Sequence, residues 1–129
     1  MVVVDTSVFI DYFRGNENTT THQLDSLLDT TLLILGDVVA LEILQGLKSK
    51  KEEKLVQNAF KSLNKKSMLD HQLAVAYADM FRYLRTKGQT IRKSNDLVIA
   101  GYCIKNGFPL LQKDRDFEPF AKHFSLELL

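Results

Sequence analysis

Short apolar runs alternate along the chain with longer segments in which apolar residues recur every three or four positions. The short runs carry no polar alternation, which is typical of strands buried on both faces of a parallel sheet. They predict strands at residues 2–4, 32–35, 67–69, 109–111 and 125–129. The periodic segments predict helices at residues 8–13, 21–29, 37–46, 50–63, 71–87, 94–106 and 117–124.

Strands that alternate with helices in this order predict an α/β sandwich built around a parallel sheet. The chain has 129 residues, which is enough for one domain to bury a hydrophobic core without disulfides. It contains no internal repeat, linker or low-complexity segment that would divide it. We therefore expect a single domain over residues 1–129.

The composition is that of a soluble globular protein, with 45% apolar and 26% charged residues. No apolar run approaches the roughly 20 residues that a membrane span requires, and the first residues do not resemble a signal peptide. The one cysteine, Cys103, lies in an apolar run and has no partner for an internal disulfide. These features lead us to expect a cytoplasmic protein without a membrane partner.

Acidic residues stand where predicted strands end or where the next helices begin. Asp5 directly follows the first strand, Asp114 and Asp116 follow a later one, and Asp96 opens a helix. Loops at the carboxyl ends of parallel strands build the binding crevice of such folds, so we expect these side chains to converge there. Carboxylate oxygens are hard ligands that suit Mg²⁺ or Mn²⁺.

Glu42 is a further candidate, although it lies inside a predicted helix about a turn and a half past its start at Asp37. Its neighbours are mostly apolar, which favours a position over the crevice, whereas an exposed helix residue is the alternative. Carboxylates brought together repel one another, which raises their pKa values unless a cation neutralises them. The acids together predict a divalent-metal site.

Each of the other acids also has a structural explanation, which the sequence leaves open. Asp5 and Asp96 can cap or favour the starts of the helices that follow them. Asp114 and Asp116 can be ordinary turn residues. A fifth aspartate, Asp11, is expected on the solvent face of its helix, with a supporting role at the crevice as the alternative.

Basic residues are concentrated in two stretches, although the net charge of the chain is only +1. Residues 48–66 contain seven lysines and two glutamates, and a solvated helix face explains this stretch as well as function does. Residues 82–93 contain five basic residues and no acid, and they lead directly into Asp96. Such a patch beside an acidic site suits a polyanion. The residues of this patch, which are candidates for binding such a polyanion, are Arg82, Arg85, Lys87, Arg92 and Lys93.

Other catalytic patterns are missing from the sequence. The three histidines are far apart and show no zinc-binding spacing, and the glycines form neither a dinucleotide-binding nor a P-loop motif. Cys103 has no neighbours that would lower its pKa and make it a nucleophile. The candidate chemistry therefore rests on carboxylates.

Four segments in this order resemble the PIN-domain family, and within it the small VapC-type toxins of prokaryotic toxin–antitoxin pairs. The segments are Val-Val-Asp5-Thr6-Ser7-Val-Phe-Ile-Asp11, Val-Ala-Leu-Glu42-Ile-Leu-Gln-Gly, Asn95-Asp96-Leu-Val-Ile-Ala and Leu-Leu-Gln112-Lys-Asp114-Arg-Asp116-Phe. The resemblance spans essentially the whole chain. Gln112 stands where related proteins commonly carry Thr or Ser.

The resemblance implies a three-layer α/β/α sandwich and an endoribonuclease that depends on Mg²⁺ or Mn²⁺ and hydrolyses RNA with metal-activated water. Asp5, Glu42, Asp96 and Asp114 match the acidic quartet of the family, and Asp116 matches a further acidic position. It also implies a homodimer that is inhibited by a cognate antitoxin protein.

The small polar pair after the first aspartate has a counterpart in the family too. Thr6 and Ser7 match positions where a hydroxyl or a backbone N–H can orient a ligand. We therefore expect both residues to support the acidic site.

Three classes of protein other than a ribonuclease also place acidic residues at the ends of strands or in a pocket. A phosphatase of the haloacid-dehalogenase type needs Asp-x-Asp after its first strand, but Thr6 and Ser7 follow Asp5. A receiver-like signalling domain needs an acidic pair and a strand-end lysine that the sequence does not offer. A catalytically silent PIN-like module that binds RNA or protein remains the alternative.

Overall fold

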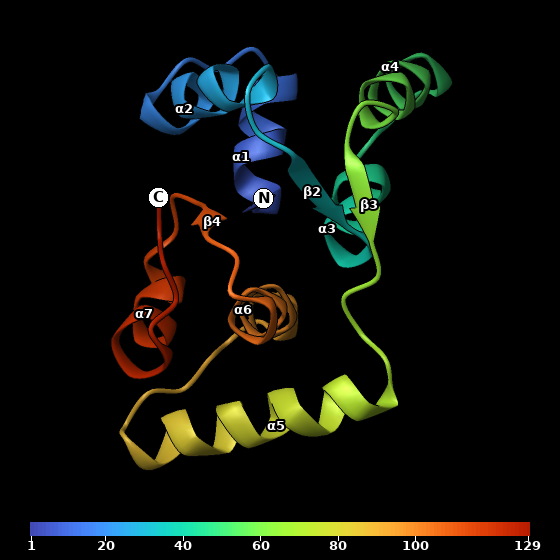
Figure 1. Ribbon diagram of the computed structural model, residues 1–129. Helices are drawn as coiled ribbons and strands as arrows, with labels where there is room; N and C mark the ends of the chain where they lie inside the picture. The colour runs from blue at the N-terminus through green and yellow to red at the C-terminus, as the bar shows by residue number, and fades with distance from the viewer.

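The computed structural model describes residues 1–129 and contains a central sheet of four parallel strands flanked by helices. The strands are β1 (Val2–Val4), β2 (Leu33–Gly36), β3 (Asn64–Lys66) and β4 (Leu110–Leu111). Their order across the sheet is β3-β2-β1-β4, and every pair is parallel. The predicted α/β class with a central parallel sheet is confirmed (Figure 1).

Seven α-helices and one short 3₁₀ helix connect the strands. They are α1 (Thr6–Phe13), α2 (Thr19–Leu28), α3 (Asp37–Gln45), α4 (Lys50–Phe60), α5 (His71–Thr86), α6 (Ser94–Asn106), η1 (Arg115–Phe117) and α7 (Glu118–Phe124). In Figure 1, α5 lies along the opposite end of the molecule from α1 and α2, with α6 next to it. None of these helices combines the length and the apolar character that crossing a bilayer requires.

Four of the seven α-helices, namely α1, α2, α4 and α5, begin where the side chain of a cap residue accepts a hydrogen bond from a backbone N–H of the first turn. Asn18 and Thr21 form a capping box at α2, Ser49 accepts a hydrogen bond from Glu52 N at α4, and Asp70 accepts one from Leu73 N at α5. Such bonds fix the helix starts locally, which is why most starts follow from the sequence.

The core lies where the sheet meets the helices and contains 27 buried apolar residues. Val3 and Val4 of β1, Ile34 of β2 and Leu110 of β4 are fully buried. Burial on both faces explains why these strands show apolar runs without alternation. The core fixes the sheet edge at which the candidate site is assembled.

The third strand was predicted at 67–69, which is wrong, because residues 64–66 pair with β2 instead. β3 is an edge strand, so it needs no apolar run, and α4 ends at Phe60 rather than at residue 63. Met68 instead packs its side chain against Gly36 and donates its backbone N–H to Asp37 Oδ1 at 3.0 Å. The apolar run thus marks a packing position rather than a strand.

The predicted closing strand at 125–129 is also wrong, because only Leu128 makes an isolated bridge, with Leu110. Ser125 adopts a left-handed conformation with φ 58° at the end of α7. The segment after this turn meets β4 only around Leu110, so no ladder of consecutive pairs forms. The last residues nevertheless extend the sheet beside β4 through Leu110 N to Glu127 O at 2.9 Å.

Candidate metal centre

Asp5 lies at the carboxyl end of β1, where it also caps α1. Its Oδ2 accepts hydrogen bonds from Ser7 Oγ at 2.6 Å and from Ser7 N at 3.3 Å. The side chain is buried, with 5% of the residue exposed. Asp5 therefore both caps α1 and lies at the carboxyl end of β1, and Ser7 orients its carboxylate.

Glu42 lies in the middle of α3 and is held by the second residue of the polar pair. Thr6 Oγ1 donates a hydrogen bond to Glu42 Oε1 at 2.9 Å, and Glu42 Oε2 has no partner within the chain. The charge of Glu42 raises the pKa of Asp5, which means that the two carboxylates lie close together. The half-buried Glu42 therefore faces the site and is not an exposed helix residue.

Asp96, Asp114 and Asp116 form the closest group of acids. Each offers a carboxylate oxygen, and these three oxygens lie within 4.8 Å of one another. Asp96 comes from the first turn of α6, and the other two come from the turn that follows β4. The Asp114 carboxylate also accepts a hydrogen bond from Asp116 N at 2.9 Å, which folds this turn into η1. Tertiary structure thus gathers residues 96 and 114–116 at one edge of the sheet.

Asp96 does not cap its helix. The cap residue of α6 is Lys93, which makes no side-chain cap bond, and Asp96 Oδ2 is buried without any hydrogen-bond partner. An unpaired buried carboxylate oxygen costs free energy and calls for a ligand. Asp96 therefore makes no cap hydrogen bond, although its charge lies in the first turn of α6, as the structural explanation predicted.

The electrostatics of the site reflect burial and crowded negative charge. The pKa of Asp96 is raised to about 7, mainly by burial and further by the charges of Asp5, Asp114 and Asp116, while Lys93 opposes the increase. Burial likewise raises the pKa of Asp5, although the hydrogen bonds from Ser7 oppose it. Both shifts mean that the folded chain holds these charges at a cost.

This donor set fits a divalent cation. The ligands on offer are all carboxylate oxygens, which Mg²⁺ and Mn²⁺ prefer, and three of them lie close enough to share one ion. A cation would give Asp96 Oδ2 the partner that the protein does not provide. Asp5 lies near enough for its charge to act on Asp96, and Glu42 joins the group through Asp5 and Thr6.

Asp11 was expected on the solvent face of α1, which is wrong, because the residue is buried with 8% exposed. Its carboxylate accepts hydrogen bonds from Asn18 Nδ2 at 2.9 Å and Asn16 Nδ2 at 3.3 Å, and it forms an ion pair with Lys113. The hydrogen bond from Lys113 lowers the pKa of Asp11. Asp11 thereby ties α1 to the turn that carries Asp114.

The sequence contained one signal for the burial of Asp11. Asp11 follows the buried Val8 by three residues, a spacing that places both on the same face of a helix. The partner Lys113 lies about a hundred residues away, so the ion pair itself follows only from the tertiary structure.

The predicted basic patch divides into two parts. Arg92 lies 3.6 Å from Asp116 Oδ1, and Lys93 is close enough to lower the pKa of Asp96. The other three basic residues lie on α5 or directly after its last residue, and each interacts with a side chain of that helix. Arg82 pairs with Asp79, Arg85 lies over the ring of Phe81, and Lys87 lies over the ring of Tyr83. Only Arg92 and Lys93 thus adjoin the acids.

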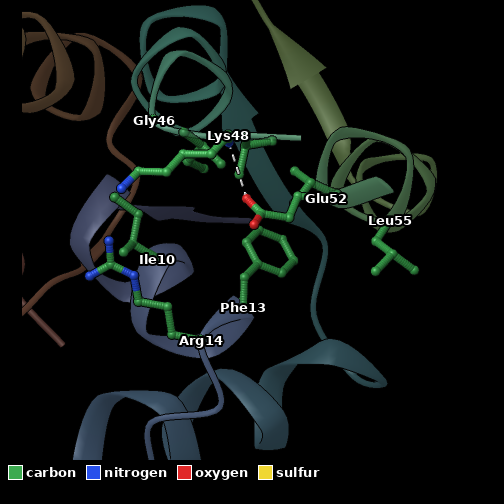
Figure 2. Close-up of a pocket in the computed structure, with 10 residues that line it drawn as sticks. Ile10, Phe13, Arg14, Gly46, Lys48, Glu52 and Leu55 are labelled. Carbon is green, nitrogen blue, oxygen red and sulfur yellow. Dashed lines mark hydrogen bonds between the residues drawn. The ribbon is translucent and has the colours of Figure 1, made fainter. Parts of the chain in front are cut away.

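An apolar groove of about 420 Å³ lies elsewhere on the molecule, between α1, the end of α3 and α4 (Figure 2). Phe13, Leu55 and Ile10 supply apolar walls. Two cations, Arg14 and Lys48, and one acid, Glu52, also line the groove. None of the candidate metal-binding acids lines it. Its apolar character distinguishes it from the polar site at the sheet edge.

Comparison with known proteins identifies the fold and the family. The family model of the PIN domain matches residues 2–123. The chain belongs to the PIN domain family. This PIN domain is 30% identical over 133 residues to a VapC ribonuclease of Mycobacterium bovis, an alignment that covers 98% of the chain and 96% of the relative. It is 29% identical to ribonuclease VapC1 of Methanocaldococcus jannaschii, with 98% and 85% covered.

Solved structures share the fold of this PIN domain over its whole length. VapBC2 from Rickettsia felis, bound to a DNA fragment from its promoter, superimposes with a TM-score of 0.80 at 18% identity and covers 100% of this chain and 98% of that one. VapBC-1 from nontypeable Haemophilus influenzae gives a TM-score of 0.78 at 16% identity, with 100% and 97% covered. The resemblance inferred from the four acidic segments is confirmed at the level of family and fold.

Proposed function

We propose that this PIN domain, over residues 1–129, is a metal-dependent endoribonuclease and the toxin of a VapBC-type pair. The observation that carries the proposal is the group formed by Asp96, Asp114 and Asp116, in which Asp96 Oδ2 is buried without a partner. Its relatives in Mycobacterium bovis and Methanocaldococcus jannaschii are VapC ribonucleases, which supports RNA as the substrate.

Asp96, Asp114 and Asp116 would hold Mg²⁺ or Mn²⁺, with Asp5 as a further ligand. A divalent ion bound there supplies charge neutralisation at the phosphate and lowers the pKa of water. Because Ser7 and Thr6 each hold one carboxylate oxygen, Asp5 and Glu42 are kept in fixed orientations. Glu42 Oε2 remains free to accept a proton from water at the edge of the site.

Positive charge beside the acids suits the backbone of RNA. Arg92 and Lys93 lie next to Asp116 and Asp96, so they can bind phosphates that flank the reacting one. Arg82, Arg85 and Lys87 extend the positive surface along α5, although they do not adjoin the acids. Single-stranded or looped RNA is the expected target because its phosphates and bases are accessible. We propose the cytoplasm as the location of this enzyme, as expected for a nuclease that acts on such RNA.

An antitoxin is the proposed regulatory partner, and a homodimer is the proposed assembly. The structural neighbours of this PIN domain are VapBC complexes, which supports an antitoxin partner. The apolar groove between α1 and α4 fits the apolar face of an antitoxin helix, with Arg14 and Lys48 placed to meet its acidic residues (Figure 2).

The groove assignment is tested by co-expression with the cognate antitoxin. Leu55→Asp puts a charge into the apolar wall and should abolish rescue of growth, whereas RNA cleavage by the purified variant should remain. Leu41→Asp, on an exposed leucine outside this groove, is the matched control. Equal rescue of both variants would contradict the assignment.

The nuclease proposal is tested by incubating antitoxin-free protein with structured RNAs and Mg²⁺ or Mn²⁺. Cleavage should require the metal, disappear with EDTA and fall by at least about 10³-fold in Asp5→Asn and Asp96→Asn. Asp25→Asn, an exposed acid on α2, is the control that should cleave normally.

Two results would argue against a metal-dependent nuclease. Cleavage that survives both EDTA and the Asp5→Asn change would point to a contaminating enzyme or another mechanism. Equal RNA binding by the unaltered and Asp5→Asn proteins, with no cleavage by either, would favour the catalytically silent module.

A further inference from the structure

A second polar cavity, of about 590 Å³, adjoins the acidic group. Its walls come from the segment that precedes α6, from η1 and from the start of α7. Asp116 belongs both to this cavity and to the acidic group, so the two are continuous. Three cations line the cavity, namely Arg92, Arg115 and Lys122.

The charges of the cavity favour an anion. Asp116 lies 3.6 Å from Arg92, so these two opposite charges partly neutralise each other. Glu118 is the other acid that lines the cavity. Neither Arg115 nor Lys122 has a carboxylate within 4.0 Å, and both are exposed. Three cations against two acids leave the lining with a net charge of +1, and the polar side chains of residues 89 and 90 complete it.

Guanidinium groups bind phosphate oxygens through two parallel N–H donors, and a lysine adds a compact charge. Apart from Ile91 and Pro119, the lining residues are polar or charged, which suits a charged backbone rather than a base or an apolar side chain. Because Asp116 belongs to both the acidic group and the cavity, an RNA strand with one phosphate at the acids can continue into the cavity.

We propose that this cavity is a subsite for the RNA phosphate next to the one that reacts, bound by Arg115 and Lys122 together with Arg92. The assignment rests on the proposed function, since it takes RNA as the substrate. It directs the strand from the acids toward α7 rather than along α5. Arg115 and Lys122 lie outside the basic stretches of the sequence, and only the tertiary structure brings them to Arg92.

The test measures RNA affinity separately from cleavage. A fluorescein-labelled single-stranded RNA is titrated in EDTA against the unaltered chain, the double variant Arg115→Ala/Lys122→Ala and a control double variant Lys51→Ala/Lys54→Ala on α4. Both variants lose the same charge from exposed positions, so non-specific attraction changes equally. Thermal unfolding of each variant checks that it is folded.

The double variant in the cavity should bind RNA about tenfold more weakly than the control variant. The slope of log affinity against log salt concentration should also decrease in size by one to two units, because each lost phosphate contact lowers the slope by about one unit. Arg115→Lys should restore part of the affinity. Equal affinities and slopes for the two double variants would overturn the subsite, as would the failure of the unaltered chain to bind RNA.

Cleavage in Mg²⁺ or Mn²⁺ then separates this inference from the proposed function. Cavity-dependent binding without cleavage would refute the nuclease while leaving the subsite in place. Normal cleavage with no effect of Arg115→Ala/Lys122→Ala on affinity or rate would refute the subsite and leave the nuclease. Stronger binding of a polyglutamate peptide than of RNA at the cavity would also overturn the assignment to RNA.

Discussion

Asp96 carries the largest electrostatic cost among the acids at the site. It is 8% exposed, one of its oxygens has no partner, and burial raises its pKa to about 7. A carboxylate in such a place favours either a proton or a cation. The same property that destabilises the metal-free chain therefore makes the residue a strong ligand.

Without metal, the folded chain should lose stability as the pH rises toward 7. Between the usual value of 3.8 and about 7, folded Asp96 keeps a proton that the unfolded chain has released, so the free energy of unfolding falls with pH. We expect the ionisation of Asp96 to lower the free energy of unfolding by about 2 kcal/mol between pH 5 and pH 7. Urea unfolding in EDTA at several pH values measures this change in the free energy of unfolding. The Asp96→Asn variant should show a weaker dependence of that free energy on pH. An unchanged slope in that variant would contradict the raised pKa.

Thr6 and Glu42 make up the other residue pair on which the site depends. Thr6→Val removes the hydrogen bond to Glu42 Oε1 while keeping the shape of the side chain. We expect about 1 kcal/mol less stability and roughly tenfold slower RNA cleavage, because Glu42 is no longer held. Thr6→Ser keeps the hydroxyl and is the control. Urea unfolding and cleavage rates check both variants, and unchanged rates in Thr6→Val would show that this bond does not support the site.

At the scale of elements, the position of Asp96 depends on how α6 packs against α5. Gly101 of α6 faces the ring of Tyr77 on α5 so closely that a Cβ atom there would overlap the ring. Tyr77 is itself held by its hydroxyl group, which donates to Met68 O at 2.8 Å. Because the Tyr77 ring is held in place, the lack of a side chain at Gly101 sets the separation of α5 and α6.

Gly101→Ala should therefore destabilise the chain by about 1–3 kcal/mol. Gly46→Ala is the matched control, because the nearest atom to its added Cβ is 3.6 Å away and its φ of −83° suits alanine. Urea unfolding of both variants compares the two sites. Equal midpoints would mean that α5 and α6 move apart without cost.

The molecule as a whole separates its charges. Acids gather at one sheet edge, while basic residues occupy α4, the end of α5 and the rim of the second cavity. A protein with this polarity can hold a polyanion and still attract a cation to one point. Binding of that cation offsets the repulsion among the acids and should couple to the stability of the entire fold.

Mg²⁺ or Mn²⁺ should raise the melting temperature of the chain. A ligand at one hundred times its dissociation constant adds about 2.7 kcal/mol to the stability of the folded state. Differential scanning calorimetry with each metal should show the increase in the unaltered chain and in Asp25→Asn but not in Asp96→Asn. An equal increase in all three proteins would place the ion elsewhere.

Much of the fold followed from local pattern. Apolar runs such as residues 2–4 and periodic segments such as 94–106 are set by neighbours along the chain, and caps such as Asp70 mark helix starts. The α/β class and the acids at the carboxyl edge follow from these elements, because parallel strands bring their ends together. The class of fold and the residue types at the candidate site can therefore be read from the amino-acid sequence.

How those residues meet depends on long-range packing. Pairing with β2 selected 64–66 rather than 67–69 as the third strand, and Lys113 drew Asp11 into the interior. The same folding left Asp96 without a hydrogen-bond partner and joined Arg115 to Lys122 around one cavity. These outcomes depend on contacts between residues far apart in the chain, whose free energy does not appear in any local pattern.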